Sequence, residues 1–145
     1  MEYTKSGLEL TEQFESCRLS AYLDSAGIPT IAWGRTAGVK LGDTCTQAQA
    51  DAWLLEDLQS AVNTVNRLVT YPVGQNIFDS LTDLVFNIGS GNFENSTMLK
   101  LLNQGELSAA AAQFERWDRA GGVEVAGLLR RRQAEEALFD TNDQS

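Results

Sequence analysis

The chain has 145 residues, of which 43% are hydrophobic and 21% are charged, and its formal net charge is −9. This length fits one domain that buries a core and can be divided by a cleft, and the acidic charge argues against nucleic acid as a partner. Histidine is absent and the only cysteines are Cys17 and Cys45, which excludes Ser-His-Asp and Cys-His nucleophile systems, histidine-based zinc and iron sites, and four-thiolate metal sites.

The N-terminal residues, Met1 to Ser6, contain no basic segment followed by an apolar stretch, so we expect no signal peptide. No apolar run approaches the roughly 20 residues that cross a bilayer, so we expect no stable membrane insertion. The sequence therefore predicts a protein that stays in the cytoplasm where it is made unless another factor releases it.

The first half of the chain predicts a helix, a hairpin and a long helix. Ser6 and Glu9 have capping-box spacing, which predicts a helix from Ser6 to about Ser16. Residues 18–34 surround the turn-prone stretch 24–27 and predict a β-hairpin whose second strand, with Pro29, lies at an edge. Thr46 and Gln49 again have capping-box spacing, and the apolar stripe that follows predicts a helix to about Leu68.

The second half predicts several shorter helices. One follows Pro72 and is stopped by Gly89, a short one spans about residues 98–102, and another spans about residues 107–117 and stops at Gly121-Gly122. The last begins near Gly127 and ends near residue 139, before a polar tail. The predicted fold class is α+β, mostly α.

Two carboxyl side chains near the N-terminus have the properties that glycosidic bond hydrolysis needs. Without histidine, acid–base chemistry falls to carboxylates or, less readily, to Lys, Tyr or Cys. One carboxyl group must keep its proton near neutral pH, and the other must be ionised. Glu15, beside Phe14 at the end of an amphipathic helix, suits the first role because partial burial raises the pKa of a carboxyl group. Asp24, in the hairpin turn, suits the second, and the Thr30 hydroxyl could hold a water molecule beside it.

A structural interpretation of the same residues is available. In a chain with 20 Asp and Glu residues, many pairs have such a separation. Glu15 could be a solvated residue of the last helical turn, and Asp24 could only stabilise its own turn. Spacing alone does not decide between these interpretations.

The residues around this pair resemble the signature of the phage lysozyme (endolysin) family. In that family a Glu is followed by an Asp nine residues later and by a Thr six residues after the Asp, and Glu15, Asp24 and Thr30 match both spacings. Residues 86–89, Phe93, 96–97 and Leu99 resemble the family's cleft-lining segment. A third, C-terminal match comprises Phe114, Trp117, 120–122, 127–128, 130–132 and Glu135.

The resemblance implies a lysozyme-like fold within one domain, residues 1–145. A sheet lobe of about residues 14–45 and a helical lobe of residues 70–145 plus the N-terminal helix would flank a cleft, joined by the helix 46–68. The resemblance also implies a muramidase that lyses bacteria by hydrolysing the β-1,4 bond between N-acetylmuramic acid and N-acetylglucosamine. Glu15 would be the general acid, and Asp24 and Thr30 would place the attacking water with inversion.

The resemblance extends to substrate and partners. The implied substrate-binding residues are Phe86, Asn87 and Gly89, with Trp33 as either a sugar-stacking platform or a core residue. Tyr22 is expected to support the site. The implied partners are peptidoglycan glycan strands and a separate holin for passage to the periplasm or outside, where a monomer would act on the cell wall. The sequence departs from the family at Ser16, in place of glycine, and at Ala32-Trp33, in place of Gly-Tyr, which puts the efficiency of the enzyme in question.

The arginine run and the two cysteines have alternative interpretations. Residues 130–132 are all arginine, and at least one must lie on a solvated helix face because consecutive helical positions diverge by about 100°. The resemblance suggests that another contacts Glu15; we prefer Arg131, then Arg130. Cys17 and Cys45 are either separate small hydrophobic residues or, because the resemblance brings their segments together, partners in a disulfide.

Two rival functions follow from the same resemblance. The chain could be a non-catalytic peptidoglycan-binding protein on a lysozyme-like scaffold, since a fold does not secure a function. It could also be an enzyme of this fold that acts on chitin or releases anhydro-sugars as a transglycosylase. The matched Asp24 and Thr30 favour hydrolysis, because hydrolysis requires a positioned water molecule. The net charge of −9 is unexpected for an enzyme of anionic cell walls.

Overall fold

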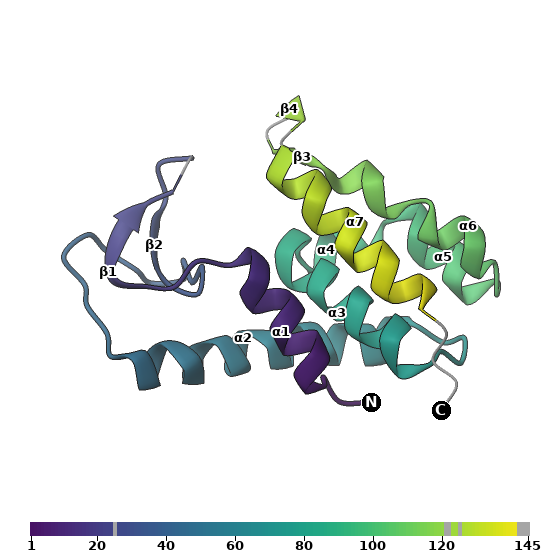
Figure 1. Cartoon of the computed structure of the whole chain (residues 1–145), viewed down its shortest axis with the longest axis horizontal. Helices are drawn as coiled ribbons and strands as arrows, with labels where there is room; N and C mark the ends of the chain where they lie inside the picture. The colour runs from purple at the N-terminus through teal and green to yellow at the C-terminus, as the bar shows by residue number, and fades with distance from the viewer. Residues whose placement is uncertain (25, 121–122, 125, 142–145) are drawn as a thin grey trace.

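The computed structural model of the chain describes residues 1–24, 26–120, 123–124 and 126–141. A small sheet lies on one side, a group of helices lies on the other, and the long helix α2 (Gln47–Leu68) runs from one to the other (Figure 1). No helix in the described part of the chain is long and apolar enough to span a membrane.

The sheet is an antiparallel hairpin of β1 (Arg18–Leu23) and β2 (Pro29–Ala32). Its register pairs Tyr22 with Thr30 and shifts between Arg18 and Tyr22. A small core lies between the hairpin and α2, consisting of Ile31, Ala32 and Ala50 with Cys17, Ala21, Trp33, Val39, Cys45 and Trp53 packed against it. The predicted hairpin is confirmed.

Helix α2 has the ends that the sequence predicts. The Thr46 side chain accepts a hydrogen bond from the backbone N–H of Gln49, and the Gln49 side chain accepts from the backbone N–H of Thr46. This reciprocal capping box satisfies two of the N–H groups that a helix start leaves unpaired. The buried side of α2 carries Leu54, Leu58, Ala61, Val62 and Val65.

Helix α3 (Gln75–Ile88) lies at the centre of the helical group and packs against α1 (Lys5–Phe14), α2 and α7 (Ala126–Asp140). It ends at Gly89, whose φ of 90° is favourable only for glycine. The remaining elements are α4 (Ser90–Glu94), α5 (Thr97–Asn103), α6 (Leu107–Ala111), the 3₁₀ helix η1 (Phe114–Trp117), β3 (Arg119–Ala120) and β4 (Val123–Glu124). The largest core cluster lies here and includes Phe78, Leu81, Leu84, Phe93, Met98, Leu102 and Phe114.

Two sequence predictions are corrected by the structure. Helix α1 begins at Lys5 rather than Ser6, because the Thr4 hydroxyl caps it by accepting from the Gly7 N–H and also donates to Asp79. The single helix predicted over residues 107–117 is two short pieces, since i to i+3 hydrogen bonds from Gln113 and Arg116 tighten the chain while Phe114 enters the core. The predicted stop at Gly121-Gly122 lies outside the described residues.

Candidate active site

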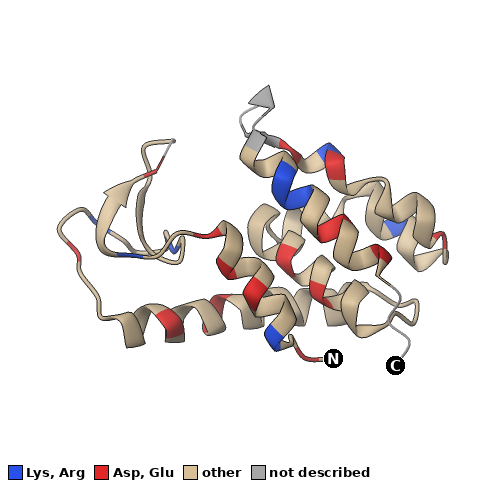
Figure 2. Ribbon diagram, in the orientation of Figure 1, with Lys and Arg blue, Asp and Glu red and all other residues tan. Residues whose placement is uncertain are grey.

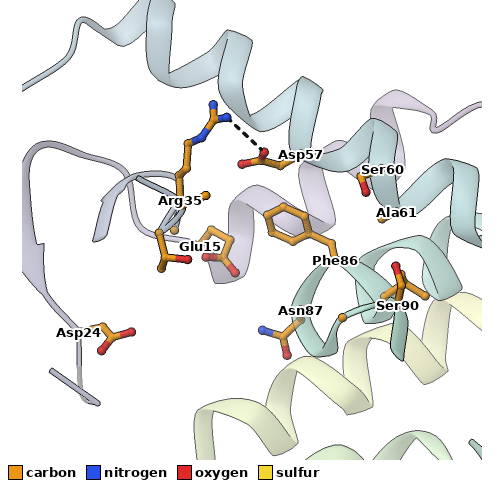
Figure 3. Close-up of a pocket in the computed structure, with 14 residues that line it drawn as sticks. Glu15, Asp24, Arg35, Asp57, Ser60, Ala61, Phe86, Asn87 and Ser90 are labelled. Carbon is orange, nitrogen blue, oxygen red and sulfur yellow. Dashed lines mark ion pairs between the residues drawn. The ribbon is translucent and has the colours of Figure 1, made fainter. Parts of the chain in front are cut away.

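A pocket of about 580 Å³ opens between the hairpin side, α2 and the end of α3 (Figure 3). Glu15 and Asp24 line it, together with Gly34, Arg35, Thr36, Ala37, Asp57, Ser60, Ala61, Val85, Phe86, Asn87, Gly89 and Ser90. Figure 3 shows the side chains of Glu15, Asp24, Phe86 and Asn87 around one open space. The pocket therefore brings residues far apart in the sequence to one place.

Glu15 follows the last residue of α1, and its backbone N–H still donates to the carbonyl of Thr11. Its carboxyl group is largely buried, with a side-chain exposure of 17%, and Oε2 lies 2.5 Å from Nη1 of Arg131. Burial raises the pKa of Glu15 above its usual range, although the charge and hydrogen bond of Arg131 lower it. Burial prevails, which favours a carboxyl group that keeps its proton.

Arg131 lies between Glu15 and a second, fully buried carboxylate, Asp83 of α3. Its Nε and Nη2 donate to the two oxygens of Asp83 at 3.0 and 2.9 Å. The Thr11 hydroxyl also donates to Asp83, at 2.7 Å. Burial acts to raise the pKa of Asp83, but hydrogen bonds from Glu135 and Arg131 hold it below its usual range. Asp83 is therefore the ionised partner of Arg131.

Glu135 and Arg132 complete this buried group. Arg132 Nη2 donates to Glu135 Oε2 at 3.0 Å, and its Nε lies 2.6 Å from Oε1 without hydrogen-bond geometry. Burial and the hydrogen bond to Asp83 raise the pKa of Glu135 well above its usual range. Two carboxyl groups this close cannot both ionise at low cost, so Asp83 and Glu135 share one proton.

Asp24 occupies the hairpin turn and is half-buried. Its Oδ1 accepts hydrogen bonds from the backbone N–H groups of Ala26 and Ile28, both at 2.9 Å. These bonds fix the side chain and shape the turn, as Asp commonly does. Because two lone pairs on Oδ2 are not used by these contacts, Asp24 can both stabilise its turn and act in the pocket that it lines.

Three other residues expected at the site, Thr30, Trp33 and Tyr22, are not among the residues that line this pocket. Thr30 is buried, and its hydroxyl donates to the carbonyl of Ile28 at 2.8 Å. Trp33 packs on the core of the hairpin side and donates its indole N–H to Asp51 of α2 at 2.9 Å. Tyr22 stacks against the guanidinium of Arg18, 4.4 Å from the ring centroid.

The end of α3 supplies the wall that faces the hairpin side. Phe86, Asn87 and Gly89 all line the pocket, and the Asn87 side chain is exposed. An exposed amide beside a half-buried aromatic ring can bind the polar and apolar faces of a sugar. These three residues are the ones that the sequence pointed to on this helix.

Sequence reasoning missed Arg35, Asp57 and Asp83. Arg35 lies 4.0 Å from Asp57 across the pocket wall, and burial raises the pKa of Asp57 although Arg35 lowers it. Arg35 directly follows Gly34 in the pocket lining, and Asp57 falls between the buried Leu54 and Leu58 of α2. Asp83 lies next to Leu84 and Val85 in a stretch of α3, residues 78–85, that is buried on all sides, and an acidic residue this close to the apolar stripe is the signal that could have drawn attention to it.

Arg130 is exposed, whereas Arg131 and Arg132 are buried, with relative exposures of 3% and 0%. Arg131 is thus the arginine of the run that contacts Glu15. Cys17 and Cys45 are both half-buried free thiols, and Cys17 Sγ accepts a hydrogen bond from Gln47 at 3.6 Å. Within the described ranges, no group of three carboxylate or thiolate side chains is placed to hold a metal ion.

Comparison with known proteins agrees with this geometry. Residues 12–135 match the phage lysozyme family. The endolysin of Acyrthosiphon pisum secondary endosymbiont phage 1 is 41% identical over 145 residues, which is 97% of this chain and 99% of that protein. The solved endolysin from Escherichia coli O157:H7 phage FAHEc1 is 36% identical with a TM-score of 0.88, covering 100% of this chain and 98% of that one.

A second solved structure gives the same result. The muramidase domain of SpmX from Asticaccaulis excentricus is 36% identical with a TM-score of 0.88, covering 97% of this chain and 99% of that one. The predicted lysozyme-like, mostly α fold is thereby confirmed. A match over residues 12–135 together with such a relative leaves one assignment: the chain belongs to the phage lysozyme family and is a glycoside hydrolase of the endolysin type.

Proposed function

We propose that this enzyme hydrolyses the β-1,4 bond between N-acetylmuramic acid and N-acetylglucosamine in bacterial peptidoglycan, and so lyses the cell wall. The observation that carries the proposal is the buried carboxyl group of Glu15, with its raised pKa, on the wall of a pocket that Asp24 also lines. A carboxyl group that keeps its proton and a second carboxylate beside a shared space are what glycosidic hydrolysis requires.

Glu15 is the general acid in this proposal. Cleavage of a glycosidic bond needs a proton on the leaving oxygen while positive charge develops on the sugar ring. A carboxyl group whose pKa is raised by burial can donate that proton near neutral pH. In the proposal, Asn87 and Phe86, which line the same pocket from the end of α3, hold the sugar ring next to Glu15.

Asp24 stabilises the positive charge that develops on the sugar ring, positions the attacking water molecule and accepts the proton that this water loses. Its Oδ2 takes no part in the turn contacts of Oδ1, so it can accept a hydrogen bond from a water molecule. In the proposal Thr30 assists: its hydroxyl proton is committed to Ile28, but its oxygen can still accept from water. Attack by that water on the face opposite Glu15 gives inversion.

The products distinguish this mechanism from its rivals. Proton NMR of a reaction on a soluble glycan fragment should show an α reducing-end anomer first, because a single displacement inverts the β bond. An initial β anomer would indicate a retaining route, and a 1,6-anhydro product would indicate a transglycosylase. Binding to peptidoglycan with no new reducing ends would favour the non-catalytic rival.

A further inference from the structure

The Arg131 guanidinium is divided unequally between two carboxyl groups. Asp83 takes Nε and Nη2, at 3.0 and 2.9 Å, whereas Glu15 is within reach of Nη1 alone, at 2.5 Å. A two-bond contact between arginine and a carboxylate is the strongest form of this pair. Asp83 therefore sets the orientation of the guanidinium, and only Nη1 is left to donate to Glu15.

Asp83 is itself held rigidly. It is fully buried on α3, and it accepts a hydrogen bond from the Thr11 hydroxyl at 2.7 Å in addition to those from Arg131. Thr11 lies within 2.7 Å of the Tyr3 hydroxyl, which links the network to the N-terminal segment. Because Thr11 belongs to α1, the same contact also fixes the helix that Glu15 directly follows.

We infer that Asp83 is a positioning residue for the acid: by holding two nitrogens of Arg131 and opposing its charge, it limits Glu15 to one arginine contact and keeps its proton available for donation. This inference rests on the proposed role of Glu15. Without the charge of Asp83, the guanidinium would be free to bind Glu15 with two bonds, and its positive charge would favour the ionised form of that carboxyl group.

The surrounding charges are consistent with this role. Arg131 and Arg132 of α7 lower the pKa of Glu15, whereas Asp83 raises it. Across the pocket, Asp24, Arg35 and Asp57 are the charged groups among its lining residues. Glu135 could replace the charge of Asp83, because it shares a proton with Asp83 and its Oε2 lies 3.9 Å from Nε of Arg131.

The test is a titration of Glu15 by ¹³C NMR of its carboxyl carbon, assigned by its loss in Glu15→Gln. In Asp83→Asn, which preserves shape and removes charge, the pKa of Glu15 should fall by about one pH unit. The alkaline limb of the kcat/KM profile should move by the same amount toward acid. In Asp83→Asn with Glu135→Gln the fall should be larger, because Glu135 can then no longer ionise in place of Asp83.

The matched control is Asp79→Asn. Asp79 is also fully buried on α3, one turn earlier, but its partners are Thr4 and Gln75, which do not contact Glu15. This change should lower the stability of the protein without shifting the pKa of Glu15 or the alkaline limb of the kcat/KM profile. Should Asp83→Asn fail to fold, Asp83→Ser, which leaves room for a water molecule beside Arg131, replaces it.

Each outcome has a distinct meaning. An unchanged or raised Glu15 pKa in a folded Asp83 variant, or an equal shift in Asp79→Asn, overturns the inference. If Glu15→Gln keeps full activity, the proposed function fails instead. The NMR titration would then still report whether Asp83 controls the protonation of Glu15, because it needs no turnover.

Discussion

Gly34 lies directly against the carboxyl group of Glu15. A Cβ atom built on Gly34 would come within 2.5 Å of Glu15 Oε1, and the backbone at Gly34 has a φ of +88°. Gly34 follows β2, so the hairpin side of the pocket contacts Glu15, the residue that directly follows α1. The position of the proposed acid thus depends on both sides of the pocket.

Gly34→Ala should displace the Glu15 carboxyl group and lower kcat by roughly 100-fold, because an error of about 1 Å at a reacting group has this effect. The matched control is Gly38→Ala, which has a similar φ of +71° but no atom within 4 Å of the added Cβ. Both variants should lose about 1–3 kcal/mol of stability from backbone strain. Equal kcat values in the two variants would contradict the account.

Asp24→Asn should lower the rate of lysis by at least about 100-fold while changing stability by less than about 0.5 kcal/mol. An Asn side chain can still accept the hydrogen bonds from Ala26 and Ile28, so the turn is kept and only the charge is lost. Asp43→Asn is a suitable control, because Asp43 accepts a backbone hydrogen bond in another exposed turn, outside this pocket. Turbidity loss and urea unfolding give the two readouts.

The free energy of unfolding of Glu135→Gln, compared with that of wild type, should increase as the pH rises. The raised pKa of Glu135 means that the folded state holds a proton that the unfolded state releases, so wild-type stability falls from about pH 4.5 up to the folded pKa. Gln cannot ionise, so the free energy of unfolding of the variant relative to wild type should increase by up to about 1.4 kcal/mol per pH unit. Urea unfolding near pH 5, 6 and 7 measures it, with the exposed Glu9→Gln as control; a constant difference would show that Glu135 ionises normally.

Salt should first accelerate lysis. The net charge is −9, and acidic residues are spread over α1, α2, α3 and α7 (Figure 2). The charged groups that line the pocket are Asp24 and Asp57 against Arg35, so both the whole protein and its pocket carry net negative charge and an anionic wall is repelled at low salt. Because the screening length shortens from about 30 Å at 0.01 M to about 10 Å at 0.1 M, the rate should rise over this range. A steady fall with added salt would contradict this expectation.

The sequence predicted most accurately those elements whose ends are set by contacts between neighbouring residues. The capping box of Thr46 and Gln49 and the turn at Asp24 involve neighbours in the chain, and both predicted elements are present. The start of α1 was wrong because Thr4 gains a partner 75 residues away, Asp79, that no local pattern reveals. Local spacing alone could not rank Thr4 above Ser6.

The other features that the sequence did not predict depend on contacts between residues far apart in the chain. Asp83 lies 48 residues from Arg131, and only the packing of α3 on α7 brings the two together. The 3₁₀ helix at Phe114 forms where that ring packs against Phe139 of α7, with ring centroids 5.5 Å apart. Residue spacing carries no information on such pairs, whereas the motif that contains Glu15 and Asp24 did identify two residues that line the same pocket.

The most direct test of the account is lysis of a cell-wall suspension by wild type, Glu15→Gln and Glu9→Gln, followed as turbidity loss. Gln keeps the size of the Glu15 side chain and removes the proton that it donates, and Glu9 is an exposed carboxylate on the same helix, α1. The account predicts that wild type and Glu9→Gln clear the suspension equally, while folded Glu15→Gln is slower by at least about 100-fold. Equal clearing by Glu15→Gln would contradict the assignment of Glu15 as the acid.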